Sequence, residues 1–82
     1  MKIVGIYKIT NLIDGKIYIG QTVNYKKRKT SHLTSLKNGK HHNEHLQRAF
    51  EKYGENSFEI KLIKECNIEE LDKLERYYIK EL

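Results

Sequence analysis

Apolar and polar side chains alternate in two runs near the start of the chain, Lys2–Thr10 and Lys16–Gln21, and both runs are rich in Ile, Val and Tyr. Period-two alternation of such residues is typical of β-strands. The dipeptide Asp14-Gly15 lies between the runs and strongly favours a hairpin turn. Because side chains alternate between the two faces of a strand, the predicted hairpin sets Tyr7 and Tyr18 side by side.

The pattern then changes to the helical period. Asn24 is a suitable N-cap for a helix over Tyr25–Lys37, and Asn38-Gly39 is a suitable end for it. A second helix is predicted over Asn43–Tyr53, with its apolar residues on one face and Gly54 directly after its end.

Alternation returns at Ser57–Lys64, which predicts a half-buried strand. Asn67 with Glu70 three residues later resembles a capping box and predicts a third helix that runs to the end of the chain. The expected element order is therefore ββααβα. We expect an α+β fold, with a small, mainly antiparallel three-stranded sheet flanked by three helices. Residues 1–82 are long enough for one domain with one modest core.

The third predicted helix carries an unusual charge. At about 100° per residue, Glu75 falls inside an apolar stripe, whereas the other charged residues, Asp72 included, fall on the opposite side. A carboxylate in such a stripe is paired, metal-bound or protonated, because burying it alone is costly. The alternative is a glutamate at the edge of the core that reaches water or pairs with an arginine. The apolar stripe consists of Ile68, Leu71, Leu74, Tyr78, Ile79 and Leu82.

The first predicted helix places Arg28 and His32 one turn apart on one edge. A guanidinium can grip two phosphate oxygens, and an imidazole can orient a group or move a proton. Lys26, Lys27 and Lys29 lie beside them, so a solvated basic face explains the pattern equally well.

A further group of histidines comprises His41, His42 and His45, and it suggests zinc only weakly. A structural zinc site needs four ligands in a tetrahedral arrangement. Contact with phosphate, or a plain surface position, is the stronger interpretation of these histidines.

Charge is distributed unevenly along the chain. Residues 1–42 carry nine Lys or Arg and one acidic residue, residues 43–82 carry seven and ten, and the net charge is +5. A basic half suits a polyanion such as nucleic acid, although a solvated lysine-rich surface accounts for the charge equally well.

Composition excludes several other protein classes. The single cysteine, Cys66, cannot form an internal disulfide. No apolar run approaches the ~18–20 residues of a membrane span, so we expect a cytoplasmic protein with no membrane partner. Phosphate-binding glycine loops and nucleophile motifs are also missing from the sequence.

Several short motifs occur in a recognisable order. Gly5-Ile6-Tyr7 and Tyr18-Ile19-Gly20 are separated by the hairpin, and Arg28, His32 and Glu75 follow on the predicted helices. Read together, these motifs resemble the GIY-YIG nuclease superfamily over nearly the whole chain. The block Leu46-Gln47-Arg48-Ala49-Phe50 in the second helix is most similar to the N-terminal catalytic domains of phage and intron-encoded homing endonucleases.

The resemblance implies a divalent-metal-dependent endodeoxyribonuclease that hydrolyses DNA phosphodiester bonds. Glu75 would be the sole protein carboxylate on one Mg²⁺ or Mn²⁺ ion. Arg28 would stabilise charge on the phosphoryl oxygens. Tyr7 would be the general base, with Tyr18 and His32 positioning it or relaying its proton. A free phenol has a pKa near 10, so nearby positive charge would have to lower it.

The expected partner is DNA, with no small-molecule cofactor, and the expected state is a monomer. The candidate DNA-binding residues are Lys26, Lys27, Lys29, His41 and Asn43.

The sequence also departs from the family pattern. Related catalytic domains commonly continue past the helix of the glutamate to a bracing asparagine, whereas this sequence ends at Leu82. We therefore expect a catalytic domain that is part of a longer protein, or a truncated form of one. The alternatives are a DNA-binding module with the same fold but little cleavage of its own, a DNA-repair nuclease domain, and a protein-interaction scaffold.

Overall fold

The computed structural model describes residues 2–81 and contains every helix and strand that the sequence predicts. The order is ββααβα, as expected. The elements are β1 (Gly5–Asn11), β2 (Ile17–Thr22), α1 (Tyr25–Lys37), α2 (Glu44–Tyr53), β3 (Phe58–Glu65) and α3 (Leu71–Glu81), with short 3₁₀ turns at Glu55–Ser57 and Ile68–Glu70.

The three strands form one antiparallel sheet in the order β2-β1-β3, so β1 is central and β2 is an edge strand. Tyr7 lies opposite Gly20, and Ile9 lies opposite Tyr18. The two tyrosines therefore share a face of the sheet, as predicted. They are not directly opposite each other, because Tyr18 pairs with Ile9. The first strand begins at Gly5, later than expected, because the carbonyl of Ile3 accepts a hydrogen bond from the backbone N–H of Tyr25 (2.9 Å) outside the sheet ladder.

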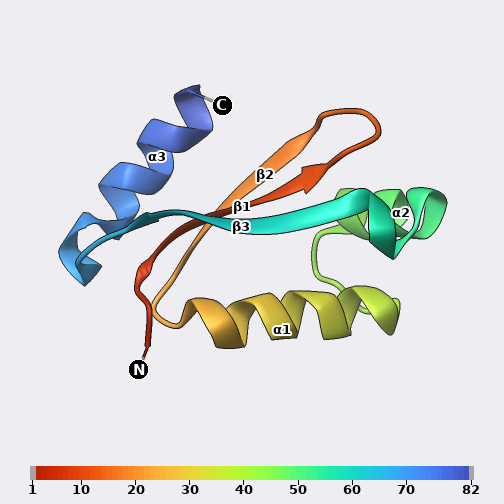
Figure 1. Cartoon of the computed structure of the whole chain (residues 1–82), viewed down its shortest axis with the longest axis horizontal. Coiled ribbons are helices and arrows are strands. Elements are labelled where there is room, and N and C mark those ends of the chain that lie inside the picture. The colour runs from red at the N-terminus through yellow and green to blue at the C-terminus, as the bar shows by residue number, and fades with distance from the viewer. Residues whose placement is uncertain (1, 82) are drawn as a thin grey trace.

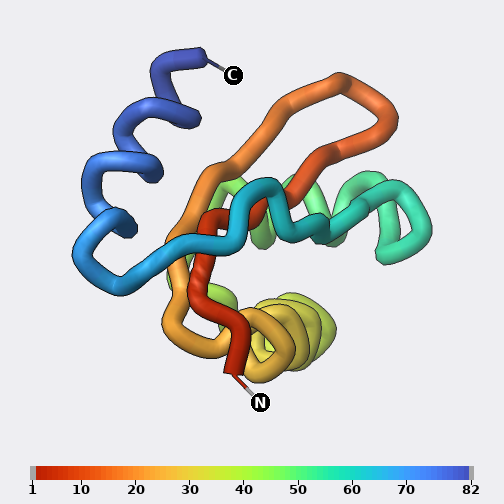
Figure 2. The backbone as a smooth tube through the Cα atoms, turned by 60° about the vertical axis from the view of Figure 1, so that its left-hand side comes forward, coloured from red at the N-terminus to blue at the C-terminus, as the bar shows by residue number. Residues whose placement is uncertain are grey.

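The helices cover both faces of the sheet (Figures 1 and 2). On one face, α1 and α2 pack against odd-numbered positions of β1 and enclose a core that contains Ile9, Leu36, Leu46 and Phe50. On the other face lies α3, next to β2 and β1. The chain thus forms three layers, and β2 runs along the edge where α1 and α3 approach each other.

Helix α3 differs from its predicted packing. Leu71 is buried, but Ile68 and Ile79 are 64% and 58% exposed. The apolar stripe is therefore only partly covered where α3 lies next to β2 and β1. Glu75 is half-buried and is not enclosed in an apolar environment. Leu82, which the prediction placed in the stripe, lies outside the described residues.

Side-chain caps fix the helix boundaries where the sequence predicts them. Asn24 accepts a hydrogen bond from the backbone N–H of Lys27 (3.3 Å), and the capping box of Asn67 and Glu70 is formed. Gly54 follows α2 with a positive φ of 89°, a conformation that favours glycine. Within residues 2–81, no helix has both the length and the apolar character to cross a membrane.

Candidate active site

The ring of Tyr7 crosses the neighbouring edge strand at Gly20. A Cβ atom added at Gly20 would overlap the Cζ and Oη atoms of Tyr7, so only glycine leaves room for this ring. A Cβ at Gly5 would likewise overlap the carbonyl oxygen of Lys64, beside the β-bulge between Ile6 and Tyr7. Both signature tripeptides therefore contain glycine for a steric reason, and the second glycine lets the tyrosine hydroxyl reach the outer edge of β2.

A chain of hydrogen bonds runs inward from the Tyr7 hydroxyl. Tyr7 Oη lies 2.6 Å from His32 Nε2, and His32 Nδ1 lies 2.7 Å from His41 Nε2. The backbone N–H of Asn43 donates to His41 Nδ1 at 3.1 Å. The chain links β1, α1 and the loop before α2, which are distant in sequence.

The direction of every bond in this chain follows from its inner end. A backbone N–H can only donate, so His41 Nδ1 is an acceptor and the proton of neutral His41 lies on Nε2. His41 Nε2–H then donates to His32 Nδ1, and neutral His32 carries its proton on Nε2. His32 therefore donates to Tyr7 Oη. The hydroxyl proton of Tyr7 is left free to point toward the outer edge of β2.

Both histidines are neutral at physiological pH. Burial, and then the neighbouring His41, Arg28 and His42, lower the pKa of His32 from 6.5 to about 4. Burial and the charge of His42 also lower the pKa of His41. These shifts agree with the bond directions, because an additional proton on either ring would have no acceptor within the chain.

The pKa of Tyr7 is raised above its ordinary value. Burial has the largest effect, Arg28 lowers the pKa by its charge and by a side-chain hydrogen bond, and the negative charge of Glu75 raises it. Arg28 thus acts in the predicted direction, but burial outweighs it. His32 thus contacts the Tyr7 hydroxyl directly, whereas Arg28 and Glu75 act on its pKa; the hydroxyl carries its proton at neutral pH.

Tyr18 lies on the same face as Tyr7 and is half-buried. It borders a small hollow of about 100 Å³ together with Tyr7, His32, His41 and His42. The rings of His41 and His42 stack with their centroids 4.5 Å apart. Within residues 2–81, no three His, Cys, Asp or Glu side chains are grouped so that they could hold a metal ion.

Glu75 reaches the site from α3, and its carboxylate is held by a residue that the sequence did not single out. Gln21 Nε2 donates to Glu75 Oε1 at 3.1 Å and to Asp72 Oδ1 at 2.8 Å. The prediction that Asp72 lies on the side of α3 opposite Glu75 is therefore wrong. No sequence signal marks Gln21, because its partners lie 51 and 54 positions further along the chain.

The donor set at Glu75 fits a hard divalent cation. Gln21 engages one carboxylate oxygen, so Glu75 can offer its other oxygen, and the carboxylate is half-exposed to water. Mg²⁺ typically binds through one or two carboxylates and keeps several waters. A single glutamate in contact with solvent is therefore an adequate protein ligand for one Mg²⁺ or Mn²⁺ ion.

The three lysines that were predicted to contact DNA do not all line the same hollow. Lys26, Lys27 and Lys29 are all exposed. Lys27 and Arg28 line a hollow of about 420 Å³ beside β2 and the start of α3, and Lys26 and Lys27 line an adjoining one. Lys29 instead borders a separate hollow near β3, together with Glu55 and Glu59. Of these three lysines, Lys27 is the one that shares a hollow with Arg28.

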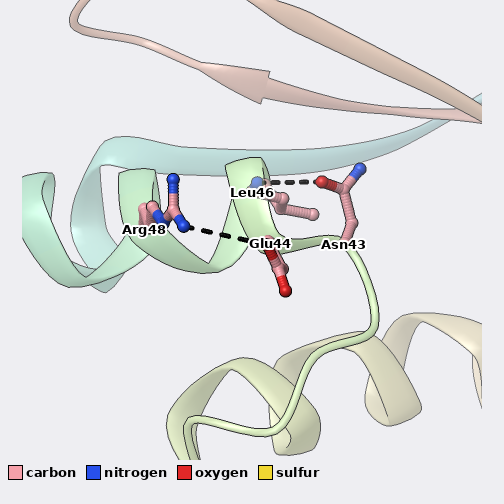
Figure 3. Close-up of polar contacts among 4 residues, drawn as sticks. All are labelled: Asn43, Glu44, Leu46 and Arg48. Atoms are coloured by element: carbon pink, nitrogen blue, oxygen red, sulfur yellow. Dashed lines mark hydrogen bonds and ion pairs between the residues drawn. The ribbon is translucent and has the colours of Figure 1, made fainter.

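Two predicted DNA contacts have other partners. His41 is buried, and both of its ring nitrogens are engaged within the protein, so the prediction that it contacts phosphate is corrected. Asn43 caps α2 by accepting a hydrogen bond from Leu46 N at 3.1 Å, beside an ion pair of Glu44 and Arg48 (Figure 3). The fold holds the ring of His41 through both of its nitrogens, and this ring is part of the hydrogen-bond chain that leads to Tyr7.

Comparison with known proteins adds to this geometry. The profile of the GIY-YIG catalytic domain matches residues 3–82. The chain belongs to the GIY-YIG family. It is 38% identical over 80 residues to intron-associated endonuclease 1 of Enterobacteria phage T4, a match that spans 95% of this chain and 32% of that protein. The chain therefore spans about a third of the length of that relative.

Solved structures show the same GIY-YIG fold. The catalytic domain of the homing endonuclease I-TevI is 34% identical, with a TM-score of 0.88, covering 96% of this chain and 87% of that one. A mutant of the catalytic domain of the intron endonuclease I-TevI is 36% identical, with a TM-score of 0.87, covering 100% of this chain and 84% of that one. The chain thus shares the α+β fold of these catalytic domains.

Proposed function

We propose that this chain is the catalytic domain of an endodeoxyribonuclease that hydrolyses DNA phosphodiester bonds with the help of one Mg²⁺ or Mn²⁺ ion. The observation that carries the proposal is the hydrogen bond between Tyr7 and His32, together with the effects of Arg28 and Glu75 on the pKa of the same tyrosine. Tyr7 comes from β1, Arg28 and His32 come from α1, and Glu75 comes from α3, so the tertiary fold brings them into one region. Membership of a nuclease family supports the same reaction.

Arg28 would bind the scissile phosphate. Its guanidinium is exposed on α1 and lines the hollow beside β2, where an incoming phosphate can approach it. A guanidinium offers two parallel N–H donors to phosphoryl oxygens and keeps its charge at any physiological pH. Charge that develops on those oxygens in the transition state is therefore stabilised by a donor already in place.

Tyr7 would accept a proton from the attacking water. Its oxygen receives a hydrogen bond from His32, and Arg28 lowers its pKa, so both residues favour the phenolate form. His32 acts as a fixed donor because its Nδ1 is already occupied by His41. The raised pKa means that only a small fraction of Tyr7 is ionised at neutral pH, so the rate should increase as the pH rises.

Glu75 would hold the ion through its free carboxylate oxygen. When bound, a divalent ion polarises the phosphate and stabilises the leaving 3′-oxygen. Tyr18 would order water in the small hollow that it shares with Tyr7 and His32.

Nicking of supercoiled plasmid tests this function. We expect nicking with Mg²⁺ or Mn²⁺ and none with EDTA. Arg28→Ala should lower the rate roughly 10²–10³-fold, as removal of one transition-state donor does elsewhere. Glu75→Gln should abolish nicking, whereas Glu81→Gln, which removes an exposed carboxylate at the end of the same helix, should leave it unchanged. Nicking that persists in EDTA or in Glu75→Gln would contradict the metal assignment.

A second candidate is a DNA-binding module with weak cleavage of its own. The adjoining hollows lined by Lys26 and Lys27 favour it, because they form a basic surface that does not involve Glu75. Such binding should be insensitive to sequence and weaken steeply with salt. Lys27→Ala should reduce the slope of log K against log salt by about one, whereas Lys29→Ala, on the β3 side, should change it less. Strong binding without nicking in any divalent metal would support this candidate.

A further inference from the structure

Gln21 bridges two carboxylates at the edge of the sheet. It lies on β2 directly after Gly20, and its Nε2 atom donates to Asp72 Oδ1 at 2.8 Å and to Glu75 Oε1 at 3.1 Å. A side-chain amide carries two N–H hydrogens on one nitrogen, so each carboxylate can take one. The amide orientation is fixed by charge, since the carbonyl oxygen would repel both carboxylates.

The two carboxylates lie close together without a cationic partner. Asp72 and Glu75 are three residues apart on α3, which places them on neighbouring positions of one face. Within residues 2–81, the ion pairs join Lys37, Arg48 and Lys61 to other acids, and Arg76 donates to the backbone carbonyl of Asp72 instead of its carboxylate. Like charges at this spacing destabilise a helix, so the pair is held together by the amide of Gln21.

The arrangement leaves one face of each carboxylate open. A shallow hollow of about 310 Å³ is lined by Asp72, Glu75 and Arg76, on the outer side of the pair. Gln21 engages one oxygen of each acid from the side of the sheet. The remaining oxygens can therefore face a cation and its water ligands from one direction.

We propose that Gln21 is the positioning residue of the metal site, and that Asp72 is a second carboxylate that raises the affinity of the site through its charge and through water. This inference rests on the proposed function, because Glu75 is taken there as the direct ligand. Gln21 holds Glu75 in one orientation with a free oxygen outward. Asp72 shares the same donor, so loss of Gln21 frees both carboxylates to rotate, whereas loss of Asp72 removes one of the two charges.

A purely structural role for Gln21 makes a different prediction. The bridge also joins β2 to α3, so its loss could loosen the helix without any effect on the ion. In that case, unfolding of the variants would become easier, but the affinity for metal of the folded protein would remain the same. Affinity and stability therefore have to be measured separately.

Binding of Mn²⁺ alone, followed by the electron paramagnetic resonance of the free ion, separates these cases. Gln21→Met keeps the length of the side chain and removes the donor, and Asp72→Asn removes the charge. We expect each to raise the Kd for Mn²⁺ roughly 10-fold or more, the usual effect of losing a group that orients a metal ligand. Glu75→Gln should abolish binding, and Glu81→Gln should leave the Kd unchanged. Circular dichroism establishes that each variant is folded.

The unaltered chain offers a measurement that needs no substitution. Traces of Mn²⁺ should broaden the side-chain amide signals of Gln21 in a ¹⁵N–¹H spectrum. The side-chain amide of Gln47, which is buried on α2 and bonded to the Leu36 carbonyl, should remain sharp. Equal intensities of the two amide signals at all Mn²⁺ concentrations would overturn the inference.

The outcomes distinguish the inference from the proposed function. A wild-type Kd in both Gln21→Met and Asp72→Asn, with binding lost in Glu75→Gln, overturns the role of the bridge and leaves the metal assignment intact. A wild-type Kd in Glu75→Gln overturns the metal assignment itself, and the bridge with it. Absence of Mn²⁺ binding in the unaltered chain does the same.

Discussion

Acid should destabilise this protein through His32, before its carboxylates become fully protonated. The side chain is buried, its Nε2 proton is directed to Tyr7, and its Nδ1 receives the proton of His41. A second proton on His32 would need Nδ1, where the hydrogen of His41 already points. Lowering the pH therefore favours the unfolded chain, in which this imidazole can be protonated freely.

The magnitude follows from the shift in pKa. Folding lowers the pKa of His32 from 6.5 to about 4, so the associated stability is present above pH 6.5, is lost as the pH falls, and is fully lost below about 4. At pH 5 the loss comes to about 2 kcal/mol by proton linkage. The full shift corresponds to about 3 kcal/mol. A domain of this size is typically stable by ~5–15 kcal/mol, so the effect should be large.

Urea unfolding at pH 8 and pH 5 measures this contribution. Between these pH values, we expect the free energy of unfolding to fall by about 2 kcal/mol more in wild type than in His32→Gln. The comparison isolates His32 because the carboxylates titrate in both proteins. His45→Gln, which removes an exposed histidine on α2, is the matched control and should behave as wild type. Equal losses in wild type and His32→Gln would refute the reasoning, as would an NMR titration of His32 with a midpoint near 6.5.

Three further predictions concern the site and the core. Gly20→Ala should displace the Tyr7 ring and lower plasmid nicking about 10²-fold, since small misplacements of reacting groups have such effects; nicking at the wild-type rate would contradict the steric argument. Tyr7→Phe should lower nicking roughly 10²–10⁴-fold, and the wild-type rate should increase with pH above neutrality because the pKa of Tyr7 is raised; a flat profile would exclude Tyr7 as the base. Leu46→Ala, at a buried position, should lower the free energy of unfolding by about 2–5 kcal/mol in urea titrations, whereas Leu12→Ala, at an exposed one, should have little effect.

Much of the fold could be predicted from local sequence patterns. The hairpin at Asp14-Gly15, the caps at Asn24 and Asn67 and the glycine at 54 each act over a few residues, and the structure places all of them as expected. Strand and helix periods identified every regular element for the same reason. The start of β1 moved from Lys2 to Gly5, because the backbone of Ile3 pairs with Tyr25 outside the sheet, and the other strand ends moved by one residue.

The residues of the candidate site were predicted with less success than the fold. The family motifs predicted a site of Tyr7, Arg28, His32 and Glu75; the structure joins Tyr7 to His32 by a hydrogen bond, and the catalytic roles stay a prediction. The prediction that His41 contacts DNA was wrong, because its ring is buried. The composition of the neighbouring sequence gave no sign of this burial. A histidine in a basic loop has the same local sequence whether it faces solvent or a second histidine.

By itself, the sequence determined the elements and their order. Tertiary structure alone decided the directed chain from Asn43 through His41 and His32 to Tyr7, and the bridge from Gln21 to Asp72 and Glu75. Turns, caps and periodicity depend on neighbours within about one helical turn. The bridge joins residues more than 50 positions apart, and such contacts exist only once the sheet has set α1 and α3 on opposite sides of β2.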